Sequence, residues 1–127
     1  MGKTAKFKLD EFFAALADRT RLRLLNLMRD GEVCVCFFAE TLGTNNPKIS
    51  RHLSYLKRAG LVIGRREGKW IHYSLNPPKD AQAAAMFDSL LKTLETDEEM
   101  QRDRANLVNV CCAPRNRFVT IDGIPAV

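Results

Sequence analysis

Apolar residues recur at intervals of three and four positions through the first part of the chain, which is the spacing of amphipathic helices. The pattern predicts one helix over residues 7–16 and a second over about 20–28. Either Asp18 or Thr20 can be the N-cap of the second helix, because a short polar side chain there accepts a hydrogen bond from the first turn. Gly31 marks the end of this helical region.

The next segment has the pattern of a helix-turn-helix unit. An apolar run over 33–39 leads into a short helix that ends at Gly43. Asn46 is predicted as the N-cap of a further helix, with Pro47 at the first helical position and Gly60 at its end. A short helix, a tight turn and a capped helix in this order are typical of a helix-turn-helix.

A β-hairpin with a basic tip is predicted directly after the second helix of this unit. Residues 61–63 and 70–75 have the pattern of two strands, and residues 65–69 between them are rich in arginine and lysine. A hairpin that follows a recognition helix is a wing, so the segment 44–76 is predicted to be the part that contacts DNA.

A long helix is predicted from Ala81 to about Val110. Its apolar face is larger than so small a body can cover, so we expect it to pair with a second copy of the chain. The predicted fold class is mainly α with a small β-hairpin wing (α+β), a winged helix-turn-helix that forms a homodimer through terminal helices. Residues 1–114 are predicted to form this DNA-binding and dimerisation domain, and residues 115–127 an irregular C-terminal tail.

The composition fits a single globular domain. The chain has 127 residues, of which 46% are hydrophobic and 28% charged, and this is enough apolar surface to form a core. No apolar run approaches the roughly 18 residues that a membrane span needs, and no apolar stretch follows the lysines near the N-terminus as it would in a secretory leader. We therefore expect a cytoplasmic protein with no membrane partner.

Positive charge is concentrated in the predicted helix-turn-helix and wing. The net charge is +5, but residues 44–76 hold seven basic residues against one acidic residue, whereas acidic residues predominate over 80–104. A basic surface of this kind favours nucleic acid as a partner. Outward side chains on the recognition helix and wing can donate to phosphate oxygens and base edges of double-stranded DNA. The predicted DNA-binding residues are Asn46, Lys48, Ser50, Arg51, His52, Ser54, Tyr55, Arg65, Arg66 and Lys69.

Three short motifs stand out: Glu-Val-Cys-Val-Cys at 32–36, Pro-Lys-Ile-Ser-Arg-His-Leu at 47–53 and Gly-Lys-Trp-Ile-His-Tyr at 68–73. Together they resemble the ArsR/SmtB family of winged-helix metalloregulatory repressors, in particular its arsenic-responsive branch. The resemblance implies a homodimer that binds a palindromic operator and leaves the DNA when cysteine thiolates capture a metalloid. It also implies that Cys34 and Cys36 are ligands at the start of the first helix of the helix-turn-helix.

The spacing of these two cysteines has a physical consequence for binding. Side chains at i and i+2 of an α-helix point roughly 200° apart, so both sulfurs reach one ion only if the backbone leaves helical geometry. We therefore predict that inducer binding distorts this segment and, through its packing on the recognition helix, changes DNA affinity. A helix N-terminus also favours the reactive thiolate. Trivalent arsenic, As(III), and antimony, Sb(III), bind typically about three thiolates, whereas structural zinc has four ligands.

A third thiolate ligand is missing from the neighbouring sequence. Ala39 occupies the place, three residues past Cys36, where several arsenic repressors have a cysteine. Cys111 and Cys112 are candidates for a site shared with Cys34 and Cys36, within one chain or across the dimer, or for a separate site. The resemblance implies that a zinc sensor of this family would have histidine and acidic ligands on the long helix, and because the predicted long helix contains no histidine, a zinc site is not favoured. The metalloid is expected as an inducer, and no constitutive cofactor is predicted.

Two other functions compete with a metalloid-released repressor. The thiols could form a redox switch on the same DNA-binding module, but i,i+2 and neighbouring cysteines make strained disulfides and the cytosol is reducing. A thiol enzyme such as a metalloid reductase belongs to a different class, and the chain has no recognisable Ser/His/Asp set or phosphate loop. We therefore expect a regulator and not an enzyme.

Overall fold

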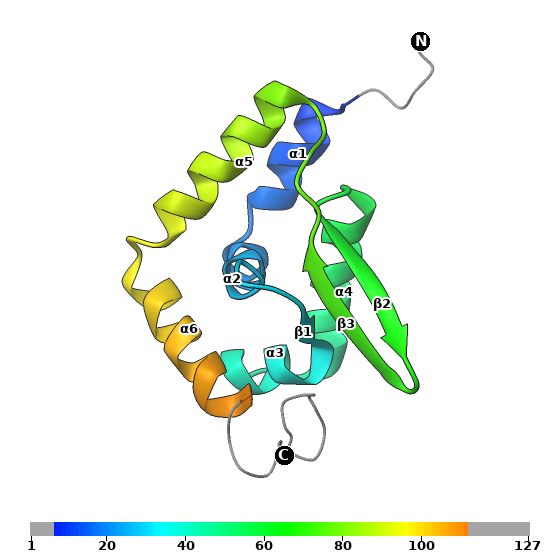
Figure 1. Ribbon diagram of the computed structural model, residues 1–127, viewed down its shortest axis with the longest axis vertical. Coiled ribbons are helices and arrows are strands. Elements are labelled where there is room, and N and C mark those ends of the chain that lie inside the picture. Colours follow the sequence, from blue (N-terminus) through cyan, green and yellow to red (C-terminus); the bar gives the residue numbers. More distant parts are fainter. Residues whose placement is uncertain (1–6, 112–127) are drawn as a thin grey trace.

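The computed structural model describes residues 7–111, so Cys112 and the predicted tail 115–127 lie outside it (Figure 1). Within this range the chain forms helices with a small three-stranded sheet, and none of these helices is long and apolar enough to cross a membrane. The elements are α1 Leu9–Leu16, α2 Arg19–Leu27, β1 Val33–Cys34, α3 Val35–Leu42, α4 Asn46–Arg58, β2 Val62–Glu67, β3 Trp70–Leu75, α5 Ala81–Leu94 and α6 Glu98–Cys111.

Helix α2 lies at the centre of the molecule, seen nearly end-on in Figure 1 with the other elements around it. It contacts α1, α4, α5 and α6, which is why four consecutive residues of α2, 24–27, are buried. The burial of apolar side chains from all these helices is the main source of stability. The largest of the buried apolar residues are Phe38, Phe87, Leu24, Leu25, Met28, Ile49, Leu53, Leu56 and Leu61.

Polar side chains cap the N-termini of α2 and α4. Asp18, one of the two predicted N-caps of α2, accepts a hydrogen bond from the backbone N–H of Arg21 at 3.0 Å. The predicted N-cap of α4 is wrong by one residue: Asn45 is the cap and accepts from the backbone N–H of Lys48 at 3.0 Å. Asn46 is instead the first helical residue, because the extended backbone that a cap requires occurs at Asn45.

The predicted wing is present and gains a third strand. Strands β2 and β3 form the hairpin, and its turn passes through Gly68, whose positive φ of 62° suits glycine. The short strand β1 pairs with the other edge of β3, giving the order β1-β3-β2. In this sheet Cys34 lies opposite His72. Cys34 is therefore part of the wing sheet, whereas Cys36 belongs to α3.

The prediction of one long helix over 81–110 is wrong, because the chain breaks between α5 and α6. The side chain of Asp97 accepts from the backbone N–H of Met100 at 3.1 Å, and its carbonyl accepts from Gln101 at 3.0 Å, so Asp97 caps a new helix. The hydroxyl of Thr96 donates to the carbonyl of Thr93, which is the type of local bond that competes with helix continuation. Helix α6 thus runs in a different direction from α5 and ends beside α3 (Figure 1).

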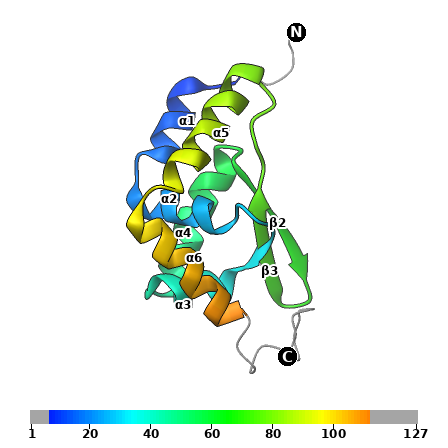
Figure 2. The same cartoon turned by 60° about the vertical axis from the view of Figure 1, so that its left-hand side comes forward.

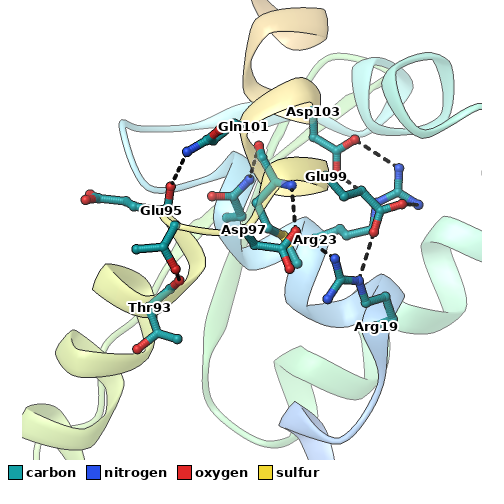
Figure 3. Close-up of polar contacts among 11 residues, drawn as sticks. Arg19, Arg23, Thr93, Glu95, Asp97, Glu99, Gln101 and Asp103 are labelled. Carbon is teal, nitrogen blue, oxygen red and sulfur yellow. Dashed lines mark hydrogen bonds and ion pairs between the residues drawn. The ribbon is translucent and has the colours of Figure 1, made fainter.

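Helix α6 is held on α2 by arginine–carboxylate pairs, which we call the α2–α6 clamp (Figure 3). Arg23 donates to both oxygens of Asp103, at 2.7 and 2.9 Å, and the Asp103 side chain is almost fully buried. Arg19 donates to Asp97 at 2.7 Å and to Glu99 at 2.8 Å. The acidic residues of 80–104 therefore include the partners of two arginines of α2.

Candidate DNA-binding surface and thiol site

Helix α4 has one buried face and one polar face. Ile49, Leu53 and Leu56 are fully buried and fix the helix against α2 and α3. The opposite face is exposed and carries amide, hydroxyl and cationic groups, the donor types that read base edges and phosphates in a major groove. The predicted residues on this exposed face are Asn46, Lys48, Ser50, Arg51 and Ser54.

Two other predicted DNA-binding residues of α4 are half-buried against α2. The guanidinium of Arg21 lies 4.0 Å from the ring centroid of Tyr55, and Arg21 Nη1 lies 3.4 Å from His52 Nδ1. Arg21 also donates to the carbonyls of Ala14 and Ala15 at the end of α1. These contacts make Tyr55 and His52 orienting residues for α4. The sequence does not predict these contacts of Arg21, because residue spacing gives no sign of a contact between α2 and α4.

The three predicted DNA-binding residues of the wing differ in their surroundings. Arg65 donates to both oxygens of Glu32, at 2.8 and 2.7 Å, and to Glu67 at 3.3 Å. These carboxylates raise the pKa of Arg65 above its usual range, so the guanidinium stays charged. Arg66 and Lys69 are exposed at the tip of the hairpin. All three cations of the wing are thus exposed, and Arg65 differs in being held by surface carboxylates.

The sulfurs of Cys34 and Cys36 already converge, which corrects the prediction that ligand binding must distort the helix. Their separation is 3.4 Å, longer than the about 2.05 Å of a disulfide. Cys34 is the N-cap of α3 with φ −70° and ψ 142°, an extended conformation, and only Cys36 is helical. The i,i+2 argument assumed that both residues are in the helix, whereas Cys34 lies in β1. Two sulfurs bound to one ion at about 2.3 Å lie within about 4.6 Å of each other, so this pair is preformed.

Cys34 is prepared to act as a thiolate. The hydrogen bond that the Cys36 thiol donates to the Cys34 sulfur lowers the pKa of Cys34 to about 6. Burial of Cys34 opposes this shift, whereas the backbone N–H groups of Cys36 and Val35 and the positive charge of His72 reinforce it. The nucleophilic form of Cys34 is therefore the main one at neutral pH.

Replacing Cys36 with alanine is expected to raise the pKa of the Cys34 thiol toward about 8.5, the ordinary value for cysteine. The reason is that alanine cannot donate to the sulfur, whereas Cys36→Ser retains a donor and is the matched control. The measurement is ultraviolet absorbance of the thiolate against pH, with Cys111 and Cys112 both changed to serine so that only Cys34 titrates. The same midpoint in the alanine and serine variants would show that Cys36 does not tune Cys34.

Helix α6 runs toward the cysteine pair of its own chain. Residues further along α6 contact residues further along the chain from α2 to β1. Asp103 pairs with Arg23, Arg104 pairs with Asp30, and Val108 lines a hollow of about 410 Å³ together with Val33. The C-terminal end of α6 lies beside α3 in both views (Figures 1 and 2). Cys111 is the last residue of α6, one helical turn beyond Val108. Within residues 7–110, no three His, Cys, Asp or Glu side chains cluster as a complete metal site.

Helices α1 and α5 lie on the side of the molecule away from the wing (Figure 2), and an apolar groove is lined by residues of both. Its volume is about 380 Å³, and its walls include Phe12, Phe13, Met86 and Leu90. Phe13 is 49% exposed, and Leu9 beside it on α1 is 53% exposed. Such exposure of large apolar side chains along two neighbouring helices is typical of a protein interface.

Comparisons with known proteins agree with this architecture. Residues 18–63 match the family described as bacterial regulatory protein, arsR family. The chain is 39% identical over 104 residues to the arsenical resistance operon repressor of Escherichia coli strain K12, covering 81% of this chain and 87% of that protein. It is 38% identical to the arsenic resistance transcriptional regulator ArsR2 of Pseudomonas putida strain KT2440, covering 75% and 81%. The crystal structure of the transcriptional repressor BigR from Xylella fastidiosa is similar with a TM-score of 0.59 and 28% identity, covering 71% and 86%.

Proposed function

The chain belongs to the arsR family of bacterial regulatory proteins, and we propose that it is a repressor released from its operator when trivalent arsenic or antimony binds Cys34 and Cys36. As a family member it is a DNA-binding transcriptional regulator and not an enzyme. We place its action in the cytoplasm, where an operator is accessible. Besides DNA, the proposed ligand is the metalloid inducer, and the proposal needs no constitutive cofactor.

The observation that carries this proposal is the preformed thiol pair. A sulfur separation of 3.4 Å and a Cys34 pKa of about 6 supply one thiolate and one adjacent thiol without rearrangement. Soft trivalent metalloids prefer such sulfur ligands. Arsenous acid, As(OH)₃, reacts with two thiols, one thiolate and one proton to give As(SR)₃ and three waters. Arsenic keeps its oxidation state, so the reaction needs no reductant.

We propose that Cys111 supplies the third sulfur from within the same chain, with Cys112 as its neighbour. The α2–α6 clamp supports this assignment, because it directs the end of α6 toward the β1–α3 junction. A shared site also explains why the sequence tolerates Ala39 where a local third cysteine would stand. Cys112 lies outside the described residues.

We propose that the apolar groove between α1 and α5 is the dimer interface. A second copy would cover Leu9, Phe13 and Met86, which are exposed in the single chain. The sequence predicts that one long helix over 81–110 pairs with the second copy. Of this range we assign only α5 to the dimer interface, because α6 is packed on α2 and α3 of its own chain. A twofold dimer presents two copies of α4 and two wings to a palindromic operator.

We propose that release follows from the position of the thiol pair between the two DNA-reading parts. Cys34 is in the wing sheet, and Cys36 is in α3, which packs against α4. Binding of a third sulfur restrains β1, α3 and α6 together. An inducer that binds more tightly to an arrangement unfit for DNA shifts the population toward it. The proposed base contacts are those of the exposed face of α4, and the wing cations contact the phosphate backbone.

The test is fluorescence anisotropy of a labelled DNA from upstream of the protein's own gene, bound by the reduced protein. Arsenite is expected to lower the anisotropy at a ratio near one arsenic per chain, and zinc to leave it unchanged. Binding that arsenite does not disturb would refute the inducer while leaving the DNA-binding function intact. Release by peroxide in the absence of arsenite would favour a redox switch instead.

A further inference from the structure

A row of residues crosses the wing sheet from the thiol pair to the wing. Cys34 on β1 lies opposite His72 on β3, and His72 lies opposite Arg65 on β2. Directly opposite residues of antiparallel strands project from the same face of a sheet. The side chains of Cys34, His72 and Arg65 therefore share one face, although they are far apart in the sequence.

Two carboxylates join the wing part of this row to each other and to the residue before β1. His72 Nε2 lies 3.5 Å from Glu67 Oε1, and the same oxygen lies 3.3 Å from Arg65 Nη2. Glu32, the residue immediately before β1, accepts two hydrogen bonds from Arg65 at 2.8 and 2.7 Å. The two-residue strand that contains Cys34 is thus tied to the wing twice, by its strand pairing with β3 and by the Glu32–Arg65 ion pair.

We propose that Arg65, held by Glu32, is the coupling residue through which inducer capture at Cys34 reaches the wing. The inference rests on the proposed function and adds a second route to the one through α3 and α4. A movement of β1 on binding displaces Glu32, which orients the Arg65 guanidinium. A guanidinium has five N–H donors, so Arg65 can hold Glu32 and still contact a DNA phosphate. Its orientation toward DNA then depends on the state of the thiol site.

A substitution at Glu32 is the most direct way to interrupt coupling through Arg65. It carries no proposed DNA or metalloid contact, and its carboxylate spans from β1 to β2. A change to glutamine keeps the size of the side chain and removes the charge that pairs with Arg65.

The test compares wild type and Glu32→Gln in three measurements: arsenite affinity of the protein alone, operator affinity without arsenite, and operator affinity with saturating arsenite. The ratio of the two operator dissociation constants is expected to fall by about two- to fivefold in Glu32→Gln, the range for one partly exposed ion pair. Arsenite affinity is expected to stay the same. Glu11→Gln, which removes a carboxylate on α1 that is 58% exposed against 36% for Glu32, is the control for loss of a surface charge and keeps the wild-type ratio.

The single tryptophan gives a second readout. Trp70 begins β3 and lies opposite Glu67 in the wing. Arsenite is expected to change its fluorescence in the wild type and less in Glu32→Gln and in Arg65→Lys, which keeps the charge but loses the two-pronged hydrogen bond.

The outcomes separate this inference from the proposed function. An unchanged operator ratio in Glu32→Gln, with normal arsenite response in the wild type, would overturn the coupling role of Arg65 alone. No arsenite response in the wild type would overturn the proposed function and the coupling role together. A reduced ratio with unchanged arsenite affinity supports the coupling route.

Discussion

Cys34→Ser is expected to abolish arsenite-induced release while leaving operator binding without arsenite within about twofold of the wild type. Cys34 supplies the thiolate of the pair, and serine replaces it with a hard oxygen that is neutral at physiological pH. Even outer-shell partners of metal sites contribute about 10- to 100-fold to affinity. The arsenite concentration for half-release is therefore expected to rise by more than about 100-fold. The measurement is operator anisotropy during arsenite titration.

The control for the serine variant is Thr41→Ser, a change of similar size on α3 that does not touch the thiol pair. It is expected to respond to arsenite as the wild type does. Cys36→Ser is expected to behave like Cys34→Ser, because each contributes one sulfur of the pair. Release of Cys34→Ser at the wild-type arsenite concentration would exclude Cys34 as a ligand.

Arg23→Met is expected to lower the free energy of unfolding by about 3–5 kcal/mol, the cost of removing one partner of a buried ion pair. Asp103 is 3% exposed, and both of its oxygens accept hydrogen bonds from Arg23. Without Arg23 this buried carboxylate loses its main cationic partner. The measurement is urea unfolding followed by circular dichroism.

The double variant Arg23→Met with Asp103→Leu is expected to recover much of the lost stability, because it removes both charges together. Arg19→Met is the exposed control, since Arg19 pairs with Asp97 and Glu99 at the surface, and it is expected to change stability little. An equal decrease in the free energy of unfolding for Arg19→Met and Arg23→Met would show that burial of Asp103 does not determine the strength of the clamp.

The sequence predicts the helix-turn-helix and the wing, because each has a local signal. Apolar spacing locates α4, Gly43 ends α3, and the two strands flank a basic turn. The exposed residues of α4 follow from the same periodicity: once Ile49 and Leu53 are buried, Lys48 and Arg51 must be exposed. Local patterns of this kind predict the position of a single helix or strand and of its caps.

Features that depend on contacts distant in the sequence could not be predicted. The break at Asp97 depends on a cap that competes with a continuous apolar pattern, and α6 is docked by the buried Arg23–Asp103 pair, 80 positions apart. The convergence of Cys34 and Cys36 depends on the pairing of β1 with β3, which a two-residue strand does not reveal. Arg65 has the sequence pattern of a plain DNA contact, and its partner Glu32 is 33 positions away.

X-ray absorption at the arsenic edge, on the full chain loaded with one equivalent of arsenite, tests the central claim most directly. The preformed pair together with Cys111 predicts three sulfur neighbours around arsenic in the wild type. The variant with Cys111 and Cys112 changed to serine is expected to show two sulfurs and one oxygen. Arsenic surrounded by oxygen alone in the wild type would contradict the assignment of Cys34 and Cys36 as the inducer site.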